Sequence, residues 1–230
     1  MRKRDEHRRV LASLEEWEPC LLSNSGLPGP RANLELVAAV ADLASRDKIE
    51  RWLESDDEFL ALCGTASIGR LLAEGDRPVL PRLRTLASDR RWRIREGVAM
   101  ALQRWGDVDV VALARELDSW ASGSRYEQRA AVAGLCEPRL MKRRDATELA
   151  LELLDHVTAS VEVANDRHSD GFKVLRQALG YCWSVAVAAL PESGLERFRR
   201  WERSSDADIS RIVRENLAKS RLQRLLPAVR

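Results

Sequence analysis

A twelve-residue phrase recurs three times in this chain, at 88–99, 169–180 and 207–218. Each copy has an aspartate, then an apolar residue and an arginine five and six positions later, within a run of helical apolar spacing. The aspartate and arginine pairs are Asp89/Arg95, Asp170/Arg176 and Asp208/Arg214. A unit that recurs at intervals of tens of residues is typical of stacked-repeat proteins. The phrase therefore predicts an architecture, and by itself it predicts no activity.

The composition favours helices over sheet. Hydrophobic residues make up 45% of the 230 residues and charged residues 32%, whereas aromatic residues make up only 5%. Few aromatic residues and short β-branched runs are unfavourable for a sheet. Many charges among many apolar residues suit amphipathic helices with one solvated face. We therefore expect an all-α protein.

Apolar spacing and breaking residues mark the expected helices. A first helix is predicted over 7–22, and the glycine- and proline-rich stretch 23–30 breaks the chain after it. Asn33 and Asp47 are predicted helix caps, and Gly106 is predicted to end a helix over 92–105. The other predicted helices cover 34–45, 47–53, 58–72, 80–87, 108–120, 124–135, 145–163, 171–190, 195–203 and 208–225.

The spacing of these helices resembles that of HEAT repeats. Second helices of successive pairs are expected near 57, 89, 123, 170 and 208, at intervals close to or below the roughly 40–47 residues of HEAT and armadillo repeats. Ile94-Arg95, Leu175-Arg176 and Val213-Arg214, and weakly Gln128-Arg129, match the Val-Arg of that family. The phrase aspartates match the family's inter-helix Asp. The match is incomplete, because Cys63 replaces one arginine and Gly123 one aspartate.

The resemblance implies an all-α, right-handed α-α superhelix, a HEAT/armadillo-like solenoid of about five helix pairs. The repeat domain is expected over 33–222. An N-terminal helix and linker over 1–26 precede it, and a tail over 223–230 follows it, all in one structural domain.

Two roles are open to the recurring Asp and Arg. In the structural role, the aspartate caps the second helix and pairs with an arginine of the neighbouring repeat. In the functional role, arginines face a concave groove and bind an extended partner. The segment 82–144 carries fourteen basic and eight acidic residues, so it is either an anion-binding patch or a solvated face with internal ion pairs.

The candidate binding residues lie where the phrase carries extra arginines and aromatics. Guanidinium groups beside an aromatic ring suit phosphates and stacked bases, although such a ring also packs between repeats. The candidates for the concave face are Arg91, Trp92, Arg93, Arg95, Arg125, Tyr126, Arg129, Arg176, Arg211 and Arg214.

A more distant resemblance is to the HEAT-like alkylpurine DNA glycosylases. That family implies a basic cleft with tryptophans and one carboxylate near the damaged base. This chain has Trp92, Trp105, Trp120 and Trp183, with carboxylates such as Asp89 and Glu96. No stretch matches the family's active-site motif, so no catalytic residue is carried across.

Other chemistry finds no support in the sequence. The four cysteines form no CxxC, and the three histidines have no partner at metal-ligand spacing, so no metal and no cofactor are expected. The charged N-terminus is unlike a signal peptide, and the longest apolar run is too short to span a bilayer. We expect a cytoplasmic, non-catalytic scaffold or adaptor that binds a protein partner on its concave face. The alternative is a DNA-binding protein, possibly glycosylase-like, that uses the basic Arg/Trp groove.

Overall fold

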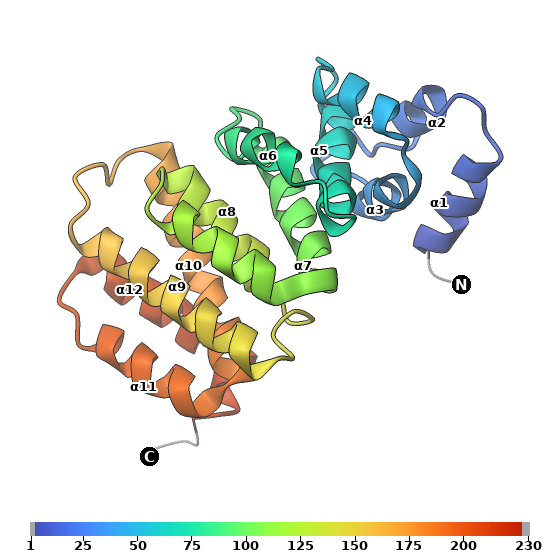
Figure 1. The fold of residues 1–230 in the computed structure, drawn as a ribbon. Helices are drawn as coiled ribbons and strands as arrows, with labels where there is room; N and C mark the ends of the chain where they lie inside the picture. The colour runs from blue at the N-terminus through green and yellow to red at the C-terminus, as the bar shows by residue number, and fades with distance from the viewer. Residues whose placement is uncertain (1–2, 227–230) are drawn as a thin grey trace. The chain divides into compact units, whose positions relative to one another are not determined.

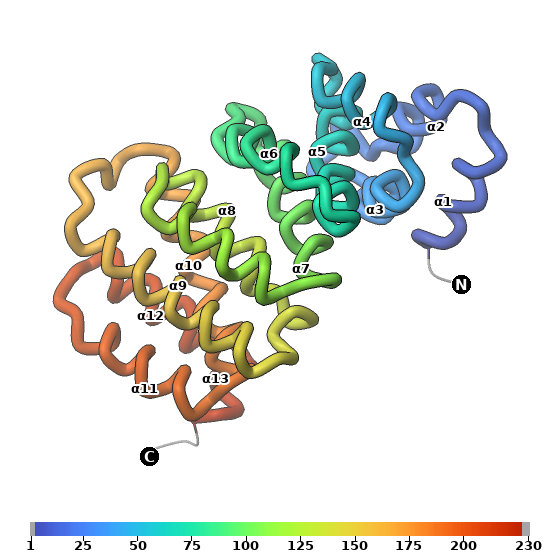
Figure 2. Tube along the Cα trace, viewed as in Figure 1, coloured from blue at the N-terminus to red at the C-terminus, as the bar shows by residue number. Residues whose placement is uncertain are grey.

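The computed structural model describes residues 3–226, and within them the chain is all-helical. Thirteen α-helices and one short 3-10 helix are present in this range, and no strand. The chain divides into two compact units, Met1–Trp105 and Gly106–Arg230. Figures 1 and 2 show the helices of each unit in chain order. Residues 227–230 of the predicted tail lie outside the described range.

Unit 1 is built around α5 (Glu58–Ala73), which contacts α2, α3, α4 and α6. Twelve of the sixteen residues of α5 are buried, because neighbours pack on several of its sides. A helix covered in this way is apolar nearly all round. The remaining helices of the unit are α1 (Lys3–Ala12), α2 (Glu18–Ser23), α3 (Leu34–Leu43), α4 (Arg46–Leu53), η1 (Arg77–Val79), α6 (Leu80–Leu86) and the first part of α7 (Trp92–Ala121).

The N-terminal region differs from the prediction of one helix over 7–22. Two helices, α1 and α2, occupy this part of the chain, and a non-helical stretch separates them. Pro19 stands in the first turn of α2, where its missing N–H costs nothing, whereas in a continuous helix it would remove a hydrogen bond. The predicted break at 23–30 is confirmed as a loop over 24–30, while Ser23 is the last residue of α2.

Helix α1 is held to the rest of unit 1 mainly by ion pairs. It buries only Leu11, and its Arg4 donates to both carboxylate oxygens of Asp42, from Nε at 2.9 Å and from Nη2 at 2.6 Å. Arg8 and Arg104 approach the same carboxylate at 3.6 and 2.5 Å. Burial raises the pKa of Asp42, but the hydrogen bonds from Arg4 and Arg104 outweigh it and hold the pKa below its ordinary value. Asp42 is therefore the ionic anchor of α1.

Unit 2 is built around α10 (Asp170–Ala189), which contacts every other complete helix of the unit. The second helices α8 (Arg125–Leu135), α10 and α12 (Ala207–Leu217) pack in succession, with α9 (Arg144–Glu162) and α11 (Pro191–Glu202) against them (Figure 1). The short α13 (Ser220–Gln223) follows α12, so the predicted helix over 208–225 is interrupted at 218–219. Trp183 and Phe172 of α10 are fully buried, and the Trp183 indole donates to Thr158 Oγ1 at 3.0 Å.

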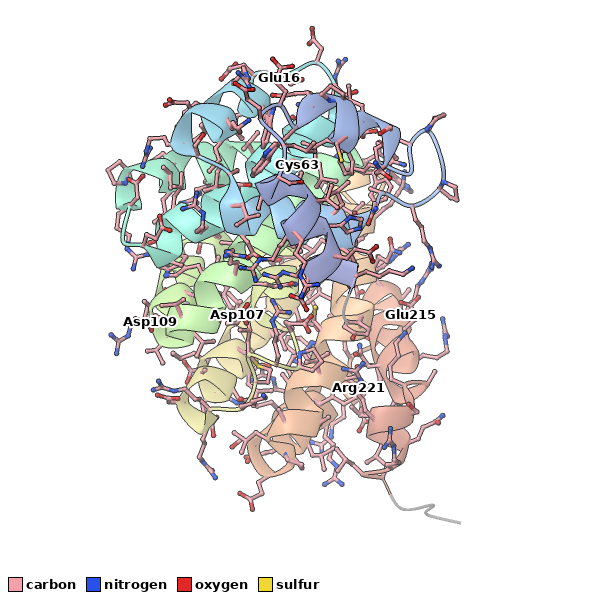
Figure 3. The ribbon with its side chains drawn as sticks, turned by 90° about the vertical axis from the view of Figure 1, so that its right-hand side faces the viewer. Glu16, Cys63, Asp107, Asp109, Glu215 and Arg221 are labelled. Atoms are coloured by element: carbon pink, nitrogen blue, oxygen red, sulfur yellow. The ribbon has the colours of Figure 1, made fainter. Side chains whose placement is uncertain are left out.

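The prediction that Gly106 ends a helix is wrong. Helix α7 runs through Gly106, and its backbone leaves the helical region at Asp109, with φ −144° and ψ 87°. Gly106 does not have the positive φ of a helix-ending glycine. A Cβ there would lie 2.8 Å from side-chain atoms of both Leu113 and Leu140, so the glycine provides space for close packing. Asp109, labelled in Figure 3, is exposed.

The second helices begin near the predicted positions, and Asp57 caps α5, but Asp170 and Asp208 do not cap α10 and α12. The observed starts are residues 58, 92, 125, 170 and 207. Ser169 and Asp206 are the N-caps of α10 and α12, so Asp170 and Asp208 lie inside the first turn rather than at the cap. There a carboxylate is stabilised by the helix dipole instead. Asp89 accepts the Arg91 N–H at 2.7 Å, and Asn33 caps α3 as predicted, whereas Ser45 and not Asp47 caps α4.

One buried amide fixes α12 against α10. Asn216 is fully buried; its Oδ1 accepts the Ser184 N–H at 2.8 Å, and its Nδ2 donates to the carbonyl oxygens of Leu179 and Ile212, each at 2.8 Å. Two of these bonds enter the backbone of α10 in the middle of the helix. Because each polar atom has a partner, the burial of Asn216 is compensated and the amide sets one register of the two helices.

Within residues 3–226, every helix is too short or too polar to cross a lipid bilayer.

Replacing Asp42 by asparagine should detach α1, because the amide carries no charge for Arg4, Arg8 and Arg104. We expect a loss of about 2 kcal/mol in unfolding free energy and faster amide hydrogen exchange in α1 than in α3. The matched control is D47N at the exposed Asp47 of α4, which should change neither. Unaltered exchange in α1 of D42N would show that Leu11 alone holds the helix.

Replacing Asn216 by leucine should destabilise unit 2, because the Ser184 N–H and the Leu179 carbonyl lose their buried partner. We expect a loss of about 2–3 kcal/mol in chemical denaturation. The control is Q177L at the exposed Gln177 of α10, which should stay within about 0.5 kcal/mol of the parent. A loss in N216L no larger than that in Q177L would contradict the role given to the amide.

Candidate functional site

The ten predicted binding residues fall in both units. Unit 1 holds Arg91, Trp92, Arg93 and Arg95 at the start of α7, and unit 2 holds the other six on α8, α10 and α12. Each unit is described by itself below.

In unit 1 the predicted arginines already have partners. Arg91 binds the Asp89 carboxylate through Nε at 3.1 Å and Nη2 at 3.0 Å, and it donates to the Ser55 carbonyl at 3.3 Å. Arg93 donates to Glu58 Oε2 at 2.8 Å and to the Gly29 carbonyl at 3.0 Å. These bonds tie the start of α7 to the start of α5 and to the loop before α3, so they are structural links between neighbouring helix pairs.

Trp92 and Arg95 are the other two predicted binding residues of unit 1. Trp92 is 47% exposed, and the Arg93 guanidinium lies 4.6 Å from its ring centroid. Arg95 donates to the backbone carbonyls of Asp89 and Arg90, at 2.6 and 3.1 Å. Arg95 thus stabilises the loop of its own phrase. Burial raises the pKa of Asp89, but the hydrogen bonds from Arg91 outweigh this effect and hold the pKa below its ordinary value.

In unit 2, Arg125 links α8 to the loop before α10. Its guanidinium contacts the Asp166 carboxylate at 3.0 Å and Ser160 Oγ at 2.9 Å. The hydrogen bond from Arg125 lowers the pKa of Asp166. Tyr126 and Arg129 lie half-buried on the same helix.

The predicted pairing of neighbouring phrases is present between α10 and α12. Arg176 of α10 binds Asp208 of α12 through Nη1 and Oδ1 at 2.5 Å. Asp170 does not take this role: its side chain is 85% exposed and pairs with Lys173 of its own helix at 3.2 Å. The difference follows from position, because Asp208 faces the neighbouring helix and Asp170 faces solvent.

Arg167, which was not predicted, completes the Asp208 contact. It binds Asp206 and Asp208 at 2.7 Å each and donates to the Val161 carbonyl at 3.0 Å. We call Arg167, Arg176, Asp206 and Asp208 the aspartate clasp. Burial raises the pKa values of both aspartates, but hydrogen bonds from Arg167, and from Arg176 to Asp208, hold them below the ordinary range. A spacing of about forty residues gave no local signal in the sequence.

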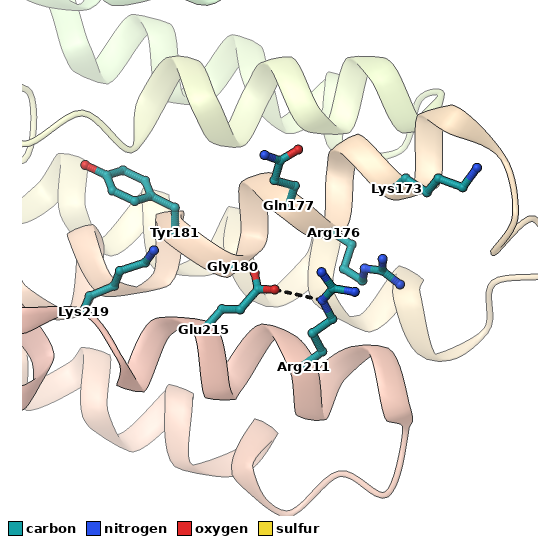
Figure 4. Close-up of a pocket in the computed structure, with 8 residues that line it drawn as sticks. All are labelled: Lys173, Arg176, Gln177, Gly180, Tyr181, Arg211, Glu215 and Lys219. Atoms are coloured by element: carbon teal, nitrogen blue, oxygen red, sulfur yellow. Dashed lines mark hydrogen bonds and ion pairs between the residues drawn. The ribbon is translucent and has the colours of Figure 1, made fainter.

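A groove lies between α10 and α12, beside the clasp. Its volume is about 690 Å³, and we call it the α10–α12 groove. Figure 4 shows side chains from both helices around it, with Arg211 bound to Glu215. The bond from Arg211 Nε to Glu215 Oε1 is 2.8 Å long. The lining residues are Lys173, Arg176, Gln177, Gly180, Tyr181, Arg211, Glu215 and Lys219.

Two of the predicted candidates, Arg176 and Arg211, line this groove. Arg214 lies exposed on α12 outside the lining. Sequence reasoning missed Tyr181 and Lys219, since Tyr181 stood in an apolar run that was interpreted entirely as core. The structure shows 40% of Tyr181 exposed, although its neighbours Cys182 and Trp183 are buried.

The tryptophans that suggested DNA-base chemistry are mostly core residues. Trp105, Trp120 and Trp183 are buried to 2% exposure or less, and only Trp92 of this set is exposed. Three of the four free cysteines are core residues as well. Cys63, Cys136 and Cys182 are buried as predicted, and burial raises the pKa of Cys63, which lies within the helices of unit 1 (Figure 3).

Among residues 3–226, no three histidine, cysteine or acidic side chains gather as a metal ion would require.

Comparison with known proteins adds no relative: no family model, no curated protein and no solved structure matches this chain.

Asp208 and Asp170 occupy the same place in the phrase, which makes them a matched pair for mutation. We expect D208N to lose about 2 kcal/mol of unfolding free energy at neutral pH and D170N to lose much less, because Asp170 is solvated. Equal losses would show that the clasp does not stabilise unit 2.

The effect of D208N should depend on pH. A carboxylate whose folded pKa is lowered stabilises the fold above its ordinary pKa, and this contribution is lost as pH falls through the lowered value. The difference in unfolding free energy between the parent and D208N, measured by urea titration, should therefore shrink below about pH 4.

Proposed function

We propose that this chain is a HEAT-like repeat protein, a non-catalytic scaffold that binds a protein partner through its second helices. In this proposal the helix pairs form a right-handed solenoid with those helices on its concave face. The succession of α8, α10 and α12 in unit 2 supports it. The buried free thiols are compatible with the reducing cytoplasm as its location.

The observation that carries the proposal is the pairing of the predicted arginines. Arg91, Arg93, Arg125 and Arg176 each bind a carboxylate, at 2.5–3.0 Å, and all four side chains are no more than a quarter exposed. An arginine that gives up such a partner to bind phosphate leaves a carboxylate without its cation. These residues therefore favour a structural role over DNA binding.

An exposed groove provides the accessible binding surface that the paired arginines do not provide. The α10–α12 groove presents polar and aromatic side chains to solvent on two helices that Asn216 and the clasp hold in register. Pre-organised surfaces of this kind lose little conformational entropy on binding. We assign the partner-binding role to this groove.

The scaffold and DNA-binding proposals predict different behaviour of the purified protein. We expect a fluorescent DNA duplex to bind with a Kd above about 100 µM at physiological salt, weaker than most non-specific DNA-binding proteins. We also expect no release of a methylated base from alkylated DNA. Micromolar binding that weakens steeply with salt, and is lost in R91A but not in a control R199A on α11, would support the DNA-binding alternative.

The protein partner can be sought with a photo-crosslinking amino acid at position 181 of the full chain. We expect one protein adduct from position 181 and none from the exposed position 199, and the captured protein, once purified, should bind in calorimetry. Adducts of equal yield from both positions, or no binding on reconstitution, would contradict the proposal.

A further inference from the structure

The basic residues of the α10–α12 groove differ in how far they are already neutralised. Lys173, Arg176 and Arg211 are bound to Asp170, Asp208 and Glu215, respectively. Lys219, in contrast, has no carboxylate within ion-pair distance among residues 3–226, and neither does Arg221 next to it. Both lie at the Tyr181 end of the groove, so an incoming anion meets available positive charge there without breaking an internal pair.

Tyr181 is held in place by these two cations. Its hydroxyl accepts a hydrogen bond from Arg221 Nη2 at 2.9 Å, and the Arg221 guanidinium lies 4.8 Å from the ring centroid. The Lys219 ammonium lies 5.7 Å from the same ring, within cation–π range. An exposed ring fixed in this way offers an apolar surface to a partner at low entropic cost. Its contacts also keep both cations at one place.

The carboxylates in and beside the groove indicate which anion fits. Glu215 lies against Gly180 so closely that a Cβ on the glycine would be 2.1 Å from Oε2. Asp208 and Asp170 stand at the other end, bound to Arg176 and Lys173. A phosphate backbone, with one charge at every nucleotide, would meet these carboxylates. A peptide can place an acidic side chain at one end and uncharged backbone, which Gln177 can bind through its amide, over the rest.

The groove has the length of a short peptide. From Lys173 to Tyr181, α10 rises roughly 12 Å at 1.5 Å per residue, which is the span of about four extended residues. We propose that the α10–α12 groove binds a short, extended, acidic segment of a partner protein, with a carboxylate at Lys219 and Arg221 and an apolar side chain against Tyr181. This inference rests on the proposed function and specifies its partner.

The test uses a labelled octapeptide with a single acid beside an apolar residue, Gly-Ser-Glu-Leu-Ser-Gly-Ser-Gly, and its amide analogue with Gln in place of the acid. Binding to the full chain is followed by fluorescence anisotropy, and the site by amide chemical shifts. We expect the acidic peptide to bind about tenfold more tightly than the amide analogue. Shift changes should be confined to 173–181 and 211–221.

A double charge reversal locates the binding, and a second one controls for net charge. K219E/R221E should weaken the acidic peptide by about tenfold, whereas R199E/R203E, at two exposed arginines in and just after α11, should leave it within about twofold. Y181A, with both cations retained, should also weaken binding. Unchanged melting temperatures of the variants show that the fold is intact.

Four results would overturn the inference. If the amide analogue binds as tightly as the acidic peptide, binding does not depend on the negative charge. If the two double reversals weaken binding equally, the peptide does not bind at Lys219 and Arg221. Octathymidylate producing the same shifts at the same concentration would make the groove a nucleic-acid surface and would also count against the proposed function. A crosslinked partner that binds while the acidic peptide does not would contradict only this inference.

Discussion

The packing of one central helix against neighbours on several sides is the constraint on which each unit depends. Helix α5 in unit 1 and α10 in unit 2 are each covered by several other helices. Helix α5 has little solvated face left, so its sequence is small or apolar at almost every turn, and it accordingly buries Gly64, Gly69, Ala61 and Ala66. The helices around it can remain strongly amphipathic.

Basic side chains fall into two groups in this protein, those that pair with carboxylates inside the fold and those that do not. Arg93, Arg125, Arg167 and Arg176 are at most 30% exposed, and each binds a carboxylate across helix pairs. Such pairs are part of the fold, and an external ligand would have to replace them. Lys219 and Arg221 bind no carboxylate among the described residues and instead hold an exposed tyrosine. The paired arginines of the sequence cluster are therefore parts of the fold, which is why we assign the proposed binding surface to Tyr181, Lys219 and Arg221 instead.

The sequence predicted what depends on local pattern. Apolar periodicity located the second helices to within a few residues, and the buried cysteines followed from their apolar surroundings. The sequence-based prediction failed where contacts between residues far apart in the chain determine the structure. Nothing near Asn216 indicates that its amide enters the backbone of α10, more than thirty residues away. Gly106 had the usual context of a helix end, but Leu113 and Leu140 pack against it and the helix ends only at the break at Asp109. Tyr181 is 40% exposed and lines the groove, although it stands in the same apolar run as the buried Cys182 and Trp183.

Helix α12 is fixed at two points. The number of residues between these points is therefore more strongly constrained than their identity. Arg167 of the clasp binds Asp206 and Asp208 at the start of α12, and Asn216 binds α10 near the end of α12. Each residue of an α-helix turns the chain by about 100°, so one residue inserted between these points would rotate Asn216 out of reach while the clasp stayed closed. Exposed positions such as Ser210 and Arg214 have no such constraint on their identity. Related sequences should accordingly vary freely at these outer positions while keeping the same number of residues between the clasp and the buried amide.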